Sequence, residues 1–71
     1  MQVSEMKSGE VRYIRDLKND EISLRLIEMG CLPGSPLTYN FAAPLGDPIC
    51  ISVEGYDLSL RIEEADSILV E

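Results

Sequence analysis

Two cysteines, Cys31 and Cys50, carry the most reactive side chains of this 71-residue sequence. They do not form a C-x-x-C pair, and the sequence has no histidine to complete a metal site or to act as a general base. Zinc usually takes four nitrogen or sulfur ligands, and a cysteine nucleophile needs a neighbouring base. We therefore expect two small buried side chains, with a disulfide or a thiolate metal site as the alternative.

An acidic run near the C-terminus offers oxygen ligands of the kind that hard cations prefer. It consists of Glu63, Glu64 and Asp66. Because its spacing matches no calcium-binding loop, a solvated turn between two strands is the better expectation for this segment.

Four aromatic residues suggest a different chemistry, the binding of a proline-rich peptide in an aromatic groove. They are Tyr13, Tyr39, Phe41 and Tyr56. Such grooves usually contain tryptophan, which this sequence lacks. Tyr39 and Phe41 share one face of a predicted strand, so we expect both rings to fill the core.

Other signals of catalysis are missing from the sequence. There is no glycine-rich phosphate loop, since Gly30, Gly34 and Gly46 each suit a turn. Without histidine, the commonest general base and metal ligand is missing as well. The sequence therefore predicts no catalytic residue, no cofactor and no metal site, and we expect a protein that is not an enzyme.

The net charge of −7 is distributed unevenly along the chain. Residues 1–40 carry five basic and six acidic side chains, whereas residues 41–71 carry one basic and seven acidic side chains. Phosphate backbones and anionic lipid headgroups repel such a surface. We therefore expect no nucleic-acid binding and no direct membrane binding, so the expected partner is another protein.

No run of about 18 apolar residues is present, and the N-terminus lacks the apolar stretch of a signal peptide. The sequence thus predicts a cytoplasmic protein with reduced thiols. Its length predicts a single domain over residues 1–71.

Three apolar side chains at helical spacing predict one short helix at residues 20–29. These side chains belong to Ile22, Leu26 and Met29. Asn19 and Asp20 precede the helix as capping residues, and Gly30 follows it, where a left-handed residue often ends a helix.

Alternating side chains predict five short strands. The strands cover residues 10–17, 37–42, 49–54, 58–61 and 68–70. Pro33-Gly34 suits a type II turn, Gly55 suits a tight turn with a positive φ, and residues 63–66 leave room for one helical turn. We predict a mainly β fold, a small SH3-like five-stranded antiparallel barrel with one short helix after the first strand; an OB-like barrel is the rival.

Four motifs of the sequence resemble those of the FeoA (ferrous-iron transport protein A) family. They are the helix end and Pro-Gly turn at 24–34, the Pro-x-Gly-Asp-Pro loop at 44–49, the Val-x-Gly-x-x-Leu-x-Leu-Arg segment at 51–61, and the closing Glu-Ala-x-x-Ile-x-Val at 64–70. Each motif alone is weak, but together they keep their order and spacing over nearly the whole chain. One departure is Cys31, at a position that is usually aliphatic in the family.

This resemblance implies an SH3-like barrel that acts as a cytoplasmic accessory protein in bacterial ferrous-iron uptake. The partner that it implies is a FeoB-type membrane permease with a cytosolic GTP-binding domain. The alternative is a metal-responsive regulatory domain related to the C-terminal domain of DtxR-type repressors, which read DNA through a helix-turn-helix that this sequence lacks. A direct iron chaperone would need ligands that the sequence barely offers.

Most residues of these motifs have a folding role, so the exposed charged residues among them are the better candidates for partner binding. They are Arg25, Glu28, Asp47 and Arg61. Local salt bridges and turn hydrogen bonds explain the same residues equally well, and the sequence leaves both readings open.

Overall fold

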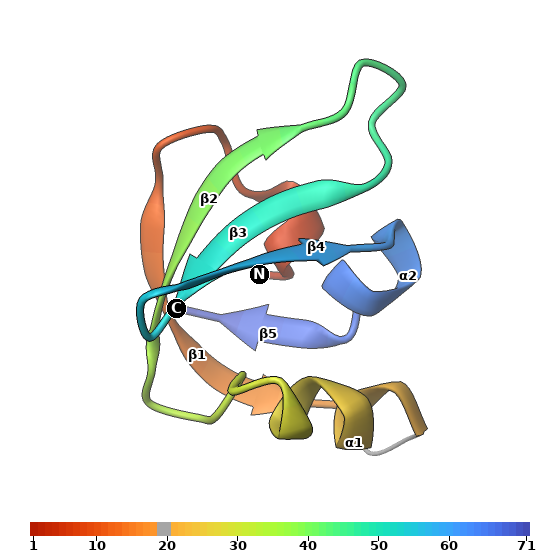
Figure 1. Cartoon of the computed structure of the whole chain (residues 1–71). Helices are drawn as coiled ribbons and strands as arrows, with labels where there is room; N and C mark the ends of the chain where they lie inside the picture. Colours follow the sequence, from red (N-terminus) through yellow and green to blue (C-terminus); the bar gives the residue numbers. More distant parts are fainter. Residues whose placement is uncertain (19–20) are drawn as a thin grey trace.

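The computed structural model describes residues 1–18 and 21–71 and contains a curled antiparallel sheet in the order β4-β3-β2-β1-β5 (Figure 1). The strands are β1 (Val11–Leu17), β2 (Pro36–Ala42), β3 (Ile49–Val53), β4 (Tyr56–Leu60) and β5 (Ile68–Val70). The helical elements are the 3-10 helix η1 (Val3–Glu5), α1 (Glu21–Glu28) and α2 (Ile62–Ala65). Five strands with a short helix after the first are confirmed, whereas the predicted capping residues Asn19 and Asp20 lie outside the described residues.

The strand β1 turns the corner of the sheet because its two halves pair with different neighbours. Val11 lies opposite Thr38 of β2, whereas Ile14 lies opposite Val70 of β5. The register against β5 shifts between Ile14 and Asp16, and such a bulge bends a strand and increases its twist. The curled shape in Figure 1 follows from this strand, which belongs to both halves of the sheet.

The helix α1 packs one apolar face against the core, as its periodicity predicts. Leu26 is fully buried, and Ile22 and Met29 pack against the buried cluster. At the C-terminal end, Gly30 has a φ of 101°, and the Cys31 N–H donates to the Leu26 carbonyl at 2.9 Å. This is the hydrogen bond of a Schellman motif, so the predicted role of Gly30 is confirmed. Among the described residues, no helix is long and apolar enough to cross a bilayer.

The strand β2 corrects one prediction, because Phe41 is 54% exposed and lies on the outer face of the sheet. Tyr39 is buried, as expected. Tyr39 pairs with Ile51 but Phe41 pairs with Cys50, so Asn40 is an extra residue in the register. A bulge of this kind reverses the alternation of inward and outward side chains beyond it. The predicted two-residue periodicity therefore ends at Tyr39.

The connection between β3 and β4 is a two-residue turn made by Glu54 and Gly55. Their φ values are 52° and 82°, and two successive positive φ values are typical of the type I′ hairpin turn. The positive φ predicted for Gly55 is confirmed. Because the turn is so short, β4 begins directly after it, two residues earlier than predicted.

The core is built from medium-sized aliphatic side chains inside the curled sheet. Its fully buried members include Ile14, Leu26, Leu37, Ile49, Ile51, Leu60 and Ile68. The N-terminal segment closes this core, because Val3 is 0% and Met6 is 5% exposed. Neither residue belongs to a predicted element. The segment is held in place partly by the Val70 N–H, which donates to the Met1 carbonyl at 2.8 Å.

The two cysteines occupy different environments, and both are free thiols. Cys31 is fully buried, as expected. Cys50 is only half-buried, because it lies between the inward-facing Ile49 and Ile51 of β3 and thus on the opposite face of the sheet. The expectation of two buried thiols is therefore wrong for Cys50.

Candidate interaction surface

Three of the four charged residues that the sequence singles out meet around α2, the short helix between β4 and β5. Arg61 immediately precedes this helix. Arg25 of α1 pairs with Glu64 of α2, and Asp47 of the β2–β3 loop accepts a hydrogen bond from the first residue of α2. We call Arg25, Asp47, Arg61 and Glu64 the α2 corner.

Glu64 is the buried centre of the α2 corner, with 7% of its surface exposed. Its Oε1 accepts a hydrogen bond from the backbone N–H of Arg61 at 2.8 Å, and its Oε2 lies 3.6 Å from Arg25 Nη2. The first N–H groups of a helix lack partners within it, and a glutamate at the third position often supplies one. The prediction of a solvated turn is wrong for Glu64. Its position three residues after Arg61 is the sequence signal that would have found it.

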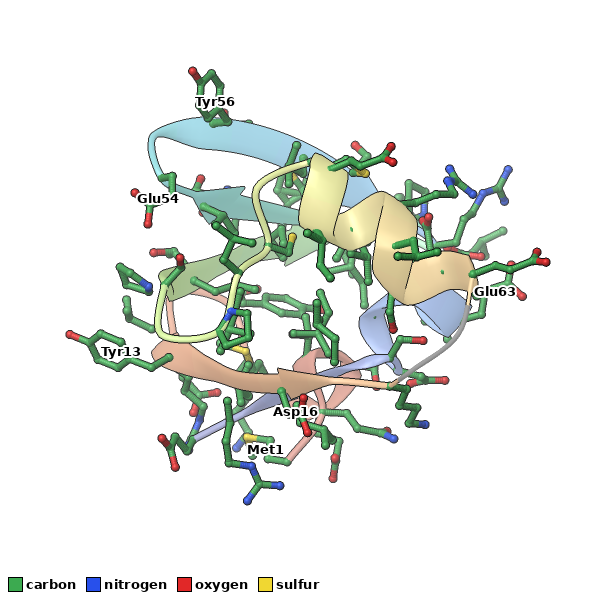
Figure 2. The ribbon with its side chains drawn as sticks, turned by 90° about the horizontal axis from the view of Figure 1, so that it is seen from below. Met1, Tyr13, Asp16, Glu54, Tyr56 and Glu63 are labelled. Carbon is green, nitrogen blue, oxygen red and sulfur yellow. The ribbon has the colours of Figure 1, made fainter. Side chains whose placement is uncertain are left out.

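The other two acids of the predicted run have separate roles. Glu63 is exposed, as its label at the edge of the molecule in Figure 2 shows, and Asp66 accepts a hydrogen bond from the Ser4 hydroxyl. Within residues 1–18 and 21–71, no three His, Cys, Asp or Glu residues gather closely enough to hold a metal ion. The acidic run is thus divided among three environments.

Asp47 tethers the β2–β3 loop to α2. Its Oδ1 accepts a hydrogen bond from the backbone N–H of Ile62 at 3.2 Å, and its Oδ2 lies 4.0 Å from Arg61 Nη1. The Arg61 side chain is 72% exposed, and that of Arg25 is 69% exposed. Local hydrogen bonds and salt bridges therefore account for part of what these residues do, while both guanidinium groups still face solvent.

The negative charge of Glu64 also affects a neighbouring thiol. Burial raises the pKa of Cys31 above its ordinary value, and the carboxylate of Glu64 raises it further. Both effects disfavour the thiolate, which is the nucleophilic and metal-binding form. Cys31 is thus an unreactive core residue, as its complete burial suggests.

Glu28, the fourth candidate, lies one helical turn beyond Arg25 and outside the α2 corner. It is exposed and lines a shallow groove between the end of α1 and the β3–β4 hairpin. No sequence motif pointed to this groove, because its two walls are more than 20 residues apart in the chain.

The aromatic residues do not form one peptide groove. Tyr39 is buried, whereas Tyr13 and Tyr56 are 57% and 69% exposed. Figure 2 shows Tyr13 and Tyr56 projecting from different sides of the molecule, one from β1 and the other from the β3–β4 hairpin. The arrangement expected for a proline-rich ligand is therefore not found among these residues.

Comparison with known proteins identifies the family. The profile of the FeoA domain matches residues 1–71. The chain is 35% identical over 72 residues to the Fe(2+) transport protein A/Fe(2+) transporter FeoB fusion protein of Porphyromonas gingivalis, a match that covers 100% of this chain and 8% of that protein. Among solved structures, iron(II) transport protein A from Clostridium thermocellum superposes with a TM-score of 0.93 at 36% identity, over 100% of this chain and 44% of the other. The chain thus spans less than half the length of these two relatives.

Two further structures define the fold. FeoA of Stenotrophomonas maltophilia, described as a prokaryotic SH3 domain protein, superposes with a TM-score of 0.87 at 28% identity, over 100% of this chain and 89% of the other. A manganese-dependent transcriptional repressor superposes with a TM-score of 0.91 at 16% identity, over 35% of its chain, which shows a shared fold alone. The predicted SH3-like barrel is confirmed. With a family profile matched from its first residue to its last, the chain belongs to the FeoA domain family.

Proposed function

We propose that this chain is a non-enzymatic accessory protein of ferrous-iron uptake that binds the cytosolic part of a FeoB-type permease. The observation that carries the proposal is the Porphyromonas gingivalis relative, in which the two proteins are one fusion protein. Covalent linkage keeps two domains at a high effective concentration. A separate chain needs a contact surface to reach the same partner.

The four charged residues singled out in the sequence are our candidates for that contact. Arg25 and Arg61 hold guanidinium groups at the surface, and such groups bind carboxylates of a partner with two parallel hydrogen bonds. Asp47 of the β2–β3 loop and Glu28 of α1 are exposed carboxylates. Because Arg25 neutralises the buried Glu64, Arg61 is the arginine whose replacement tests binding with the smaller effect on folding.

We further propose that the chain acts as one domain in the cytoplasm and reaches the membrane through the permease instead of through lipid. The support is electrostatic, since residues 41–71 carry seven acidic and one basic side chain. Anionic headgroups and nucleic-acid phosphates repel this surface.

The proposal is tested by biolayer interferometry between this protein and the soluble GTP-binding domain of a FeoB-type permease, with and without GTP. We expect saturable binding, which Arg61→Gln weakens by about fivefold or more, as the loss of one charged interface contact does. Arg15→Gln is the matched control, because it removes the same charge from an exposed position of β1. Absence of binding in every nucleotide state would refute the proposed function.

The alternative is a metal-responsive regulatory domain, and the shared fold with the manganese-dependent repressor is its support. Liposomes separate the proposals further. Co-sedimentation with permease-containing vesicles but not with protein-free anionic vesicles supports the accessory role. Saturable binding of Mn²⁺ or Fe²⁺ without permease binding supports the regulatory role.

A further inference from the structure

A groove of about 450 Å³ separates the end of α1 from the β3–β4 hairpin. It is lined by Glu28, Met29, Gly30, Glu54, Tyr56, Asp57 and Leu58. We call it the hairpin groove. Its volume lies within the range of sites that hold a few side chains or a small ligand. None of its lining residues belongs to the α2 corner.

The floor of the hairpin groove is apolar and is formed by Met29 and Leu58. Both side chains are partly buried and pack against the hydrophobic core. Tyr56 stands at the edge with most of its ring in solvent, and Figure 2 shows it projecting from the hairpin. An aliphatic side chain of a partner would gain contact with this floor without any rearrangement of the core.

The rim of the groove carries three carboxylates and no basic side chain. Glu28, Glu54 and Asp57 are all exposed. Elsewhere in the described residues, the acids Glu10, Asp47 and Glu64 pair with arginines. The rim acids form no such ion pair among residues 1–18 and 21–71, so their charge is available to a cation from outside.

One rim carboxylate is held in a defined orientation. The Ser52 hydroxyl donates to Asp57 Oδ1 at 2.6 Å, and Asn40 Nδ2 donates to Ser52 Oγ at 2.8 Å. This row of hydrogen bonds crosses three adjacent strands on the outer face of the sheet. A carboxylate fixed in this way loses little conformational entropy on binding.

Glu54 occupies a backbone position where a different residue is preferred. In a turn with two successive positive φ values, Asn or Asp usually precedes Gly, because their short side chains tolerate the left-handed conformation. Glu54 therefore carries a negative charge at the tip of the hairpin where the turn itself would favour asparagine (Figure 2).

We propose that the hairpin groove binds a segment of a partner protein that carries a Lys or Arg side chain between aliphatic ones. The cation lies among the rim carboxylates and against the Tyr56 ring, where cation–π attraction adds to the ion pairs, and an aliphatic neighbour covers Met29 and Leu58. This proposal rests on the proposed function in expecting a protein partner, and it specifies the chemistry of the segment that binds.

Two other occupants fit less well. A second copy of the chain carries the same net charge of −7 and is repelled. A divalent ion needs ligands that converge on one point, and within the described residues no three acidic, histidine or cysteine side chains do so. Separated carboxylates beside an apolar floor suit an extended cationic side chain.

The test is an NMR titration of the ¹⁵N-labelled protein with the peptide acetyl-Leu-Arg-Leu-Lys-Leu-amide at low salt. We expect saturable shifts at residues 28–30 and 54–58. Glu54→Asn should weaken binding by about two- to fivefold, the range for one exposed ion pair. Because asparagine suits the turn, this variant folds at least as well as the parent protein. Glu63→Gln is the control, since it removes the same charge from an exposed position of α2.

Shifts confined to other surfaces, equal weakening by both variants, or equal binding of a peptide with Glu in place of Arg and Lys would each overturn the proposal. A parallel measurement with the permease GTP-binding domain separates it from the proposed function. If that domain binds but Glu54→Asn changes nothing, the hairpin groove is not the contact while the accessory role stands. If the peptide binds at the groove and no permease domain binds, only the accessory role fails.

Discussion

The α2 corner and the hairpin groove both contain carboxylates, yet the two regions use them in opposite ways. In the α2 corner, Glu64 and Asp47 each accept a backbone N–H and lie near an arginine. At the hairpin groove, Glu28 and Glu54 have no such partner among the described residues. The difference teaches that charge density alone does not identify an interaction surface. Exposed carboxylates without an intramolecular hydrogen-bond or ion-pair partner are the better indication of an interaction surface.

The largest effect is expected where a carboxylate serves the fold. Glu64→Ala removes the acceptor of the Arg61 N–H and the partner of Arg25, and should lower the free energy of unfolding by about 1–3 kcal/mol. Glu64→Gln keeps the acceptor and should cost less. Urea denaturation measures both, with Glu63→Ala as a control that changes the value by no more than about 0.5 kcal/mol. An equal loss of unfolding free energy in Glu63→Ala and Glu64→Ala would show that the partners of Glu64 do not stabilise the fold.

The hairpin has one folding requirement of its own, at Gly55. A Cβ there would meet no atom within 4 Å, so the cost of a substitution lies in the backbone, whose φ is 82°. Gly55→Val should therefore cost about 1–2 kcal/mol or more in thermal or urea unfolding. Gly55→Asn should cost less, because asparagine tolerates this conformation. Similar losses for both variants would show that side-chain crowding dominates instead.

A smaller effect concerns the thiol beside Glu64. Burial and the Glu64 charge raise the pKa of Cys31 in the folded protein, so its contribution to stability is complete below pH 9.0, its ordinary value, and is lost as the pH rises through the raised pKa. We expect the free energy of unfolding to fall more steeply above pH 9 in the parent protein than in Cys31→Val. Native labelling with a thiol reagent should modify Cys50 first. Faster labelling of Cys31 would contradict its burial.

The smallest effect is expected from divalent metal. The unpaired carboxylates of the hairpin groove do not converge on one point, and Cys31 and Cys50 lie on opposite faces of the sheet. Anaerobic calorimetry with Fe²⁺ should therefore show no stoichiometric site of micromolar affinity. A one-to-one isotherm at that affinity would support a direct iron chaperone. The carboxylates of the hairpin groove would then be candidate metal ligands instead of contacts for a cationic side chain.

The features that sequence predicted well are those determined by local backbone preference. Gly30 and Gly55 have the positive φ values that a helix end and a tight turn require. The helical spacing from Ile22 to Met29 and the alternation of β3 similarly depend on near neighbours. These signals were enough to place the five strands and the first helix along the chain and to indicate a small antiparallel barrel.

The features that sequence missed depend on contacts between distant segments. Phe41 faces outward because β2 has an extra residue relative to β3, and the register of a partner strand is not a local property. Glu64 is buried because α2 packs beside α1, which brings Arg25 to it. The hairpin groove has walls from two separate parts of the chain, so no single motif could indicate it.

The pairing of the chain ends determines how the domain responds to force. The Met1 carbonyl accepts the Val70 N–H, and Glu71 and Tyr13 exchange two backbone hydrogen bonds at 2.9 and 3.1 Å. Because the N-terminal segment runs antiparallel to β5, tension on the two ends loads these bonds one after another, as in a zipper, and not all together in shear. We expect the domain to begin unfolding here at low force, with β5 peeling from β1 first. An unfoldase that pulls on the C-terminal end therefore starts by removing β5, the edge strand that pairs with the second half of β1.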